Sequence, residues 1–188
     1  MEQMTKDGYE LSPKIPRNYG ITGGSTEDPV IFQMWKKGIS ESLIQGSKFY
    51  GIIPDGRTYT IDFLQQKKIE GDNASGDIKV SIVRPKVVVP REKFDWSFDI
   101  EGVQGGLVET QDEFMYLAPE AGYQPKYVVN MLANDPNWKR EIDKLQFYFQ
   151  SRDGKVYGRF VVDIIPDYNE QSVFNVRYAV NPNGSRNL

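Results

Sequence analysis

The stretch "LQFYFQSRDGKVYGRFVV", Leu145 to Val162, decides the fold class. Apolar and polar residues alternate on both sides of Asp153-Gly154, a dipeptide typical of two-residue hairpin turns. Because the side chains of a strand alternate between its two faces, this turn brings the apolar residues of both strands onto one face. The register predicts the pairs Leu145–Val162, Phe147–Phe160 and Phe149–Gly158. We therefore expect an antiparallel hairpin with one buried face.

Tyr148, Tyr157 and Arg159 point to the opposite face of this predicted hairpin. Tyr148 lies directly across the ladder from Arg159, where an aromatic ring and a guanidinium group can stack. Tyrosine and arginine are also enriched at protein interfaces. If a partner covers this face, the pattern predicts an interaction surface. If water covers it, the residues form an ordinary solvent-exposed surface.

Two further aromatic residues fall in connections between strands. Tyr123 lies in "APEAGYQP", and Trp138 follows the loop Asn134 to Asn137. A ring in such a place can stack on a sugar or on another chain, or it can fold over the edge of the core. We include Tyr123 and Trp138 in the candidate interaction surface.

The alternation of apolar and polar residues continues through most of the chain after Asp77. Glycine and proline clusters separate the alternating segments, which is typical of packed antiparallel sheets. The predicted strands are Ile78–Val83, Phe94–Ile100, Tyr127–Met131, Leu145–Gln150, Val156–Ile164 and Phe174–Val180. The fold class we expect is mainly β, an antiparallel immunoglobulin-like β-sandwich with one or two short helices.

A second Asp-Gly turn occurs in "PDGRTYTIDF", Pro54 to Phe63. Treated as a hairpin, Asp55-Gly56 pairs Ile52 with Tyr59 and Tyr50 with Ile61. The tyrosine after this turn then shares a face with the apolar residues, unlike Tyr157 after the first turn. The likeness therefore indicates shared turn chemistry and no domain duplication. We expect a single sandwich domain over residues 25–188, preceded by an extended arm over residues 1–24.

Two segments carry helix signals. Asp28 and Pro29 suit the start of a helix, and Gly38 suits its end. A second short helix is predicted from Asp135-Pro136, because Trp138, Ile142 and Leu145 recur at helical spacing.

Two residue types are absent from the sequence, and their absence excludes several kinds of catalytic and metal-binding site. The chain has no Cys and no His among its 188 residues, which excludes Ser-His and Cys-His nucleophiles, imidazole and thiolate metal ligands, and disulfides. A formal charge of -3 with scattered basic residues does not favour nucleic-acid binding. We expect no enzyme and no cofactor.

The remaining options are carboxylate chemistry, oxygen-ligated metals, lysine chemistry, or no catalysis. A glycosidase would need two carboxylates across a scissile bond, one in an apolar pocket. The candidates by residue type are Asp95, Asp99, Asp112, Glu113 and Glu120. The acidic stretch Glu70 to Asp77 does not match the spacing of a calcium-binding EF-hand loop, so a solvated connection is the favoured interpretation there and a looser oxygen-ligand site is the alternative.

Three short motifs carry a resemblance: "GYQP" at Gly122 to Pro125, "RDGKVYGR" at Arg152 to Arg159, and the tail "NPNGSRN" at Asn181 to Asn187. With them the chain resembles exported, immunoglobulin-like, pilus-associated surface proteins of mucin-degrading gut bacteria, which are related in fold to archaeal type IV pilins. The likeness covers about Tyr50 to Leu188. It implies no catalytic residues.

The resemblance implies a function on the cell surface. We expect a non-catalytic structural or adhesive component of a type IV pilus-like assembly, with other pilus or surface proteins, a host or glycan surface, or further copies of the chain as partners. The sequence has no apolar run of the roughly 20 residues that a membrane helix needs, and Met1 to Tyr9 lack a signal peptide's apolar region. We therefore expect an exported protein whose targeting segment has been removed. The alternatives are a carbohydrate-binding module and a carboxylate glycosidase.

Overall fold

The computed structural model describes residues 9–11, 34–36, 41–73, 75–112 and 115–188. The chain forms two compact units, Met1–Ser40 and Glu41–Leu188. In the first unit, β1 (Tyr9–Leu11) pairs antiparallel with β2 (Met34–Lys36). The helix predicted from Asp28 to Gly38 is therefore wrong at Met34–Lys36, where a partner strand competes with the helical pattern. The rest of that helix and the predicted boundary after Gly24 lie outside the described residues.

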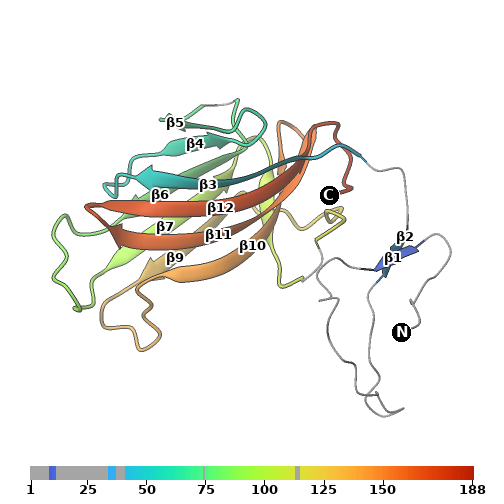
Figure 1. The fold of residues 1–188 in the computed structure, drawn as a ribbon. Helices are drawn as coiled ribbons and strands as arrows, with labels where there is room; N and C mark the ends of the chain where they lie inside the picture. Colours follow the sequence, from blue (N-terminus) through green and yellow to red (C-terminus); the bar gives the residue numbers. More distant parts are fainter. Residues whose placement is uncertain (1–8, 12–33, 37–40, 74, 113–114) are drawn as a thin grey trace, which may run out of the picture. The chain divides into compact units, whose positions relative to one another are not determined.

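The second unit is a sandwich of two antiparallel five-stranded sheets, which confirms the predicted fold class (Figure 1). Sheet I has the order β3 (Ile44–Ile52), β12 (Gln171–Asn181), β11 (Val156–Tyr168), β10 (Ile142–Ser151) and β8 (Gly106–Glu109). Sheet II has the order β5 (Lys67–Glu70), β4 (Tyr59–Asp62), β6 (Ile78–Val83), β7 (Trp96–Gly102) and β9 (Lys126–Met131).

The hairpin that connects β10 and β11 has the register that the sequence predicts. Leu145 pairs with Val162, Phe147 with Phe160, and Phe149 with Gly158. Gly158 is required by packing, because a Cβ at this position would lie 2.2 Å from Cε1 of Phe149. Asp153 and Gly154 both have positive φ, as a type I′ turn needs.

The second Asp-Gly turn does not form a hairpin, so the predicted pairs of Ile52 with Tyr59 and Tyr50 with Ile61 are wrong. β3 belongs to sheet I and β4 to sheet II, and the turn carries the chain from one sheet to the other. Gly56 N donates to Ile82 O, and Arg84 N donates to Pro54 O. The turn thus bonds to the end of β6 instead of closing a ladder between its own flanking strands.

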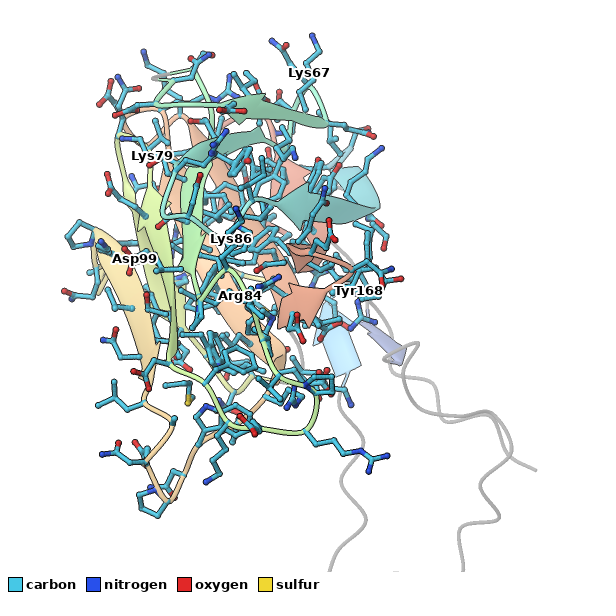
Figure 2. The ribbon with its side chains drawn as sticks, turned by 90° about the vertical axis from the view of Figure 1, so that its left-hand side faces the viewer. Lys67, Lys79, Arg84, Lys86, Asp99 and Tyr168 are labelled. Carbon is cyan, nitrogen blue, oxygen red and sulfur yellow. The ribbon has the colours of Figure 1, made fainter. Side chains whose placement is uncertain are left out.

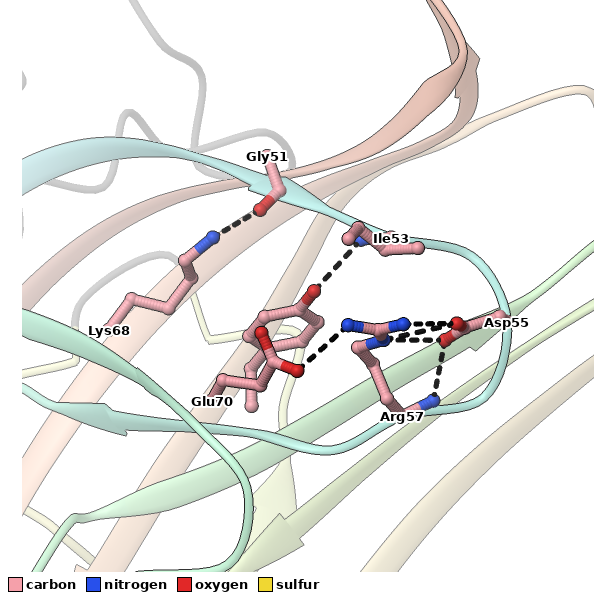
Figure 3. A network of polar contacts seen from close by, with 7 residues as sticks. Gly51, Ile53, Asp55, Arg57, Lys68 and Glu70 are labelled. Carbon is pink, nitrogen blue, oxygen red and sulfur yellow. Dashed lines mark hydrogen bonds and ion pairs between the residues drawn. The ribbon is translucent and has the colours of Figure 1, made fainter.

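Side-chain contacts fasten this crossover (Figure 3). The guanidinium group of Arg57 bonds both carboxylate oxygens of Asp55 and reaches Glu70 at 2.8 Å. Tyr59 accepts a hydrogen bond from Ile53 N through its hydroxyl oxygen. Lys68 Nζ donates to Gly51 O. Side chains of sheet II are therefore hydrogen-bonded to the end of β3.

Aromatic rings from both sheets fill the core. Phe63 of sheet II is fully buried, and its ring centroid lies 5.3 Å from Phe149, 5.9 Å from Phe160 and 4.6 Å from Tyr178. Burying each such ring contributes about 1.5–3 kcal/mol. In β7 buried residues alternate with partly exposed ones, which is the pattern expected of a strand with one core face.

The second predicted helix is a turn. Asp135 accepts hydrogen bonds from Asn137 N through its carboxylate at 2.7 Å and from Trp138 N through its carbonyl at 3.1 Å. After one turn the chain becomes extended, because Ile142 pairs with Ile164 in β11. The part of the chain that the structure describes contains no helix.

The strands place two sets of connections at opposite ends of the sandwich. The tail end contains residues 152–155, which join β10 to β11, and the C-terminal residues 182–188. The loop end contains residues 53–58, 84–95, 132–141 and 166–170. The pairing of Ile44 with Val180 and of Ile52 with Ser172 places these ends at opposite limits of β3.

Candidate functional site

The structure brings four of the five predicted surface residues together on the outer face of sheet I. Tyr148 pairs with Arg159, as expected. The rings of Tyr123 and Tyr157 meet edge to face, with centroids 6.4 Å apart and planes at 64°. Trp138 lies elsewhere, at the loop end.

This face is covered by the chain itself. A small apolar cluster holds Tyr148 together with Met115, Ala118 and Leu188, and leaves Tyr148 4% exposed. The guanidinium group of Arg159 donates to Met115 O and lies over the ring of Tyr116. Two segments distant in sequence therefore fold over Tyr148 and contact Arg159, whereas Tyr123, Tyr157 and Arg159 stay partly exposed. The interaction surface stays a prediction for these three residues.

Burial changes the ionisation of the covered residues. It raises the pKa of Tyr148 and of Tyr123 to about 12 each. It also lowers the pKa of Arg159. Both tyrosines stay neutral to higher pH than usual, and the hydroxyl groups of Tyr123 and Tyr148 donate to Pro119 O and to the carboxylate of Asp112, respectively.

The C-terminal residues hold the covering segment in place. Ala118 N donates to Arg186 O at 2.9 Å, and Leu188 N donates to Tyr116 O at 2.7 Å. Arg186 also bonds the carboxylate of Glu120 at 2.8 Å. Residues 186–188 thus form a short antiparallel bridge with residues 116–118.

The tail motif "NPNGSRN" encloses a carboxylate at the start of the domain. Glu41 accepts hydrogen bonds from Ser185 Oγ at 2.6 Å, Asn187 Nδ2 at 2.6 Å and Asn181 Nδ2 at 2.7 Å. These donors lower the pKa of Glu41, with Ser185 contributing most. The motif is visible in the sequence, but its partner is 140 residues away from Asn181, so no local pattern identifies Glu41.

A buried carboxylate closes the tail end between the sheets. Asp77 is fully buried and accepts hydrogen bonds from Phe63 N at 2.7 Å, Ser151 Oγ at 2.7 Å and Arg152 Nε at 3.0 Å. Arg152 also lies 3.0 Å from the carboxylate of Asp62. Asp77 therefore links β4 of sheet II to the hairpin turn of sheet I.

This role differs from the metal loop considered for Glu70 to Asp77. Asp77 points into the protein, and Asp72 pairs instead with Lys79 at 2.9 Å. Within the described ranges, no group of three or more acidic side chains is arranged to hold a metal ion. The looser oxygen-ligand site has no support in this geometry.

Arg84 organises the loop end. Its side chain is 2% exposed, and its guanidinium group donates to Pro166 O at 2.7 Å, Pro85 O at 2.8 Å and Gln171 O at 3.3 Å. Figure 2 views the domain from this end and shows Arg84 between the two sheets. These bonds tie the segment after β6 to the turn between β11 and β12.

Several large apolar side chains are exposed around Arg84. Val87 is 78% exposed, and it lies in the run Val87–Val89 between Pro85 and Pro90. The exposed apolar residues at or next to the loop end are Phe49, Ile53, Val83, Val87, Val89, Leu132 and Tyr168. Such a gathering is typical of a surface that contacts another molecule.

Trp138 belongs to this loop end. Its indole nitrogen donates to Phe94 O at 2.8 Å, and its ring meets Phe94 edge to face at 5.8 Å. Lys93 and Arg140 lie over the Trp138 ring at 5.7 Å each. The ring is half-buried and does not share a plane or a face with the candidate tyrosines.

The carboxylates considered for a glycosidase are spread over the domain. Asp95 accepts a bond from Ala133 N, and Asp99 pairs with Lys126 at 2.8 Å. Asp112 accepts a bond from the Tyr148 hydroxyl, and Glu120 pairs with Arg186. Glu113 lies outside the described residues. Each of the four described groups has a different partner, and their geometry does not support a catalytic pair.

No family model and no curated protein matches the chain. Among solved structures, the crystal structure of an apo HmuY analog from Tannerella forsythia is similar at a TM-score of 0.48 and 13% identity. The match covers 77% of this chain and 100% of that one. At this score the likeness carries no inference about function. Within the described ranges, no helix is long and apolar enough to span a membrane.

Proposed function

We propose that this protein is a non-catalytic structural or adhesive component of a pilus-like cell-surface assembly, and that the loop end contacts its partner. The observation that carries the proposal is the group of exposed apolar side chains around Arg84. Exposing several such residues at one end is costly unless another molecule covers them.

The contrast between the two ends supports the same role. On the aromatic face, Tyr148 is buried by the chain and its neighbours are partly covered, so this face offers less area to a partner. At the loop end, the buried Arg84 attaches the start of the segment that carries Val87 and Val89 to Pro166 and Gln171. The exposed apolar side chains of this segment are available to a partner.

The carbohydrate-binding alternative has less support. It expects exposed and coplanar rings among Tyr123, Tyr148, Tyr157 and Trp138. The rings of Tyr123 and Tyr157 meet at 64°, and Tyr148 is 4% exposed. A flat stacking platform is therefore not formed by these four residues.

The test is complementation in the organism that produces the protein. Deleting the gene is expected to reduce surface fibres or cell adhesion, and the wild-type gene restores them. Val87→Glu is expected not to restore them, because a charge on the loop end disfavours an apolar contact. Val128→Glu, on an exposed residue of β9, is the matched control and is expected to restore them.

Two results would contradict the proposal. One is full restoration by Val87→Glu. The other is complete protection of the protein from protease added to intact cells, because a surface component must be accessible from outside.

A further inference from the structure

β3 is a nine-residue strand at an edge of sheet I. In the described part of the chain it pairs with β12 on one side. Edge strands present unpaired backbone groups, and a long one is a template for another strand unless it is interrupted or covered. β3 contains a single charged residue, Lys48.

The contacts of β3 show which backbone groups face its free side. Gly51 O accepts a bond from Lys68, and Ile53 N donates to Tyr59, both from sheet II (Figure 3). Alternate residues of an antiparallel edge strand direct their N–H and C=O groups to the same side. Gln45, Ser47 and Phe49 therefore direct theirs outward, where sheet II does not bond them.

A buried hydroxyl group lies beside the same edge. Tyr178 is 5% exposed, and its hydroxyl oxygen is buried with no hydrogen-bond partner among the described residues. Tyr178 pairs with Gly46 of β3, and its ring occupies the space where a side chain at Gly46 would lie. A buried hydroxyl without a partner is destabilising, so a donor that reaches it is stabilising.

We propose that a second copy of the chain pairs with β3 antiparallel to itself, with the two-fold axis at Ser47. In this register Ser47 faces Ser47 and Gln45 faces Phe49 of the other copy. The outward groups of these residues then form about six backbone hydrogen bonds between the copies. The proposal does not depend on the surface role of the loop end.

The side chains favour this register over its neighbours. Lys48 of one copy lies opposite Gly46 of the other, where its ammonium group can reach the unpartnered hydroxyl of Tyr178. Ile44 lies opposite Tyr50, which is a favourable aromatic and β-branched pair. An axis at Lys48 would instead place two ammonium groups opposite each other. An axis at Phe49 would require Gly51 O, which Lys68 already bonds.

The first test measures the mass of the full chain by sedimentation equilibrium. We expect a dimer with a Kd in the micromolar range, about 1–100 μM. Ser47→Pro is expected to weaken the dimer at least about tenfold, because proline removes the outward N–H and is tolerated on the free side of an edge strand. Ser47→Thr keeps the N–H group and is the matched control, with a Kd close to that of wild type.

A double substitution tests the register. Lys48→Met and Tyr178→Phe are each expected to weaken the dimer several-fold, and the double variant is expected to be no weaker than the Lys48→Met variant, since both changes remove one contact. Additive losses would overturn the predicted contact and with it the axis at Ser47.

Amide hydrogen exchange of wild type keeps the proposal testable if Ser47→Pro does not fold. Exchange at Gln45, Ser47 and Phe49 is expected to slow as protein concentration rises, while exchange at Lys48, which bonds to β12, stays constant. A monomer at all concentrations up to about 1 mM, a dimer unaffected by Ser47→Pro, or exchange independent of concentration would overturn the proposal.

Discussion

The two ends of the sandwich are closed around buried charges of opposite sign: the carboxylates of Asp77 and Asp62 at the tail end, and the guanidinium group of Arg84 at the loop end. At the tail end, the carboxylate of Asp77 accepts hydrogen bonds from both sheets, including one from the cation Arg152. At the loop end, Arg84 bonds mostly backbone carbonyls. The first arrangement fixes strands to one another, whereas the second fixes a connecting loop and leaves apolar side chains exposed.

The same contrast appears in the two Asp-Gly turns. Asp153-Gly154 at the tail end joins two neighbouring strands, and Asp55-Gly56 at the loop end passes the chain from sheet I to sheet II. Both glycines have positive φ, but of the two aspartates only Asp153 does, so the same dipeptide adopts two backbone conformations. The strands that are available as neighbours determine whether a hairpin forms.

The largest effect is expected from Asp77→Asn. This change removes the buried charge that faces Arg152, and it is expected to lower the free energy of unfolding by about 3–5 kcal/mol. Urea unfolding followed by tryptophan fluorescence measures the loss. Asp72→Asn, on an exposed partner of Lys79, is the control and is expected to change stability by less than about 1 kcal/mol. Equal effects would show that Asp77 does not hold the tail end together.

Arg84→Met is expected to have the next largest effect. It leaves buried carbonyl groups such as Pro166 O without a donor and is expected to cost about 3 kcal/mol. Lys86→Met removes a cation from the exposed part of the same segment and is expected to be nearly neutral. Hydrogen exchange shows where the loss occurs: faster exchange at the loop end, with the tail end unchanged, is the expected result.

The two turn glycines are expected to have similar, smaller effects. Gly56 has φ +87° and Gly154 has φ +78°, so Gly56→Ala and Gly154→Ala are each expected to cost about 1–2 kcal/mol through backbone strain. Thermal unfolding compares them under identical conditions. A neutral Gly56→Ala would show that the crossover turn is not held in the left-handed conformation.

The smallest effect concerns pH. The pKa of Glu41 is lowered in the folded protein, so its contribution to stability is present above its usual value of 4.5 and is lost as pH falls through the lower folded value. The melting temperature of Glu41→Gln is therefore expected to lie below that of wild type near pH 7, and the difference is expected to shrink as pH falls below 4.5. Glu120→Gln is the control. A constant difference at all pH values would contradict a role for the Glu41 charge.

Local patterns in the sequence predict the sheets well, and they predict the ends poorly. Alternation identifies β6, β7 and the β10–β11 register, because these depend on neighbouring residues and on one turn. Asp77 and Arg84 look like loop or surface residues in sequence, since only the opposite sheet shows that they are buried. The cover over Tyr148 depends on Leu188 and Met115, which no local pattern connects to it.

The order of strands in sheet I has a consequence for how the domain is made. Its first strand, β3, lies beside its last, β12, and β12 is the strand that joins β3 to β11 and the rest of the sheet. Loop closure between such distant segments is slow and must come before the pairing that rewards it. A chain still emerging from the ribosome cannot complete this sheet until Gln171–Asn181 is synthesised, so β3 has no strand of its own sheet to pair with until then.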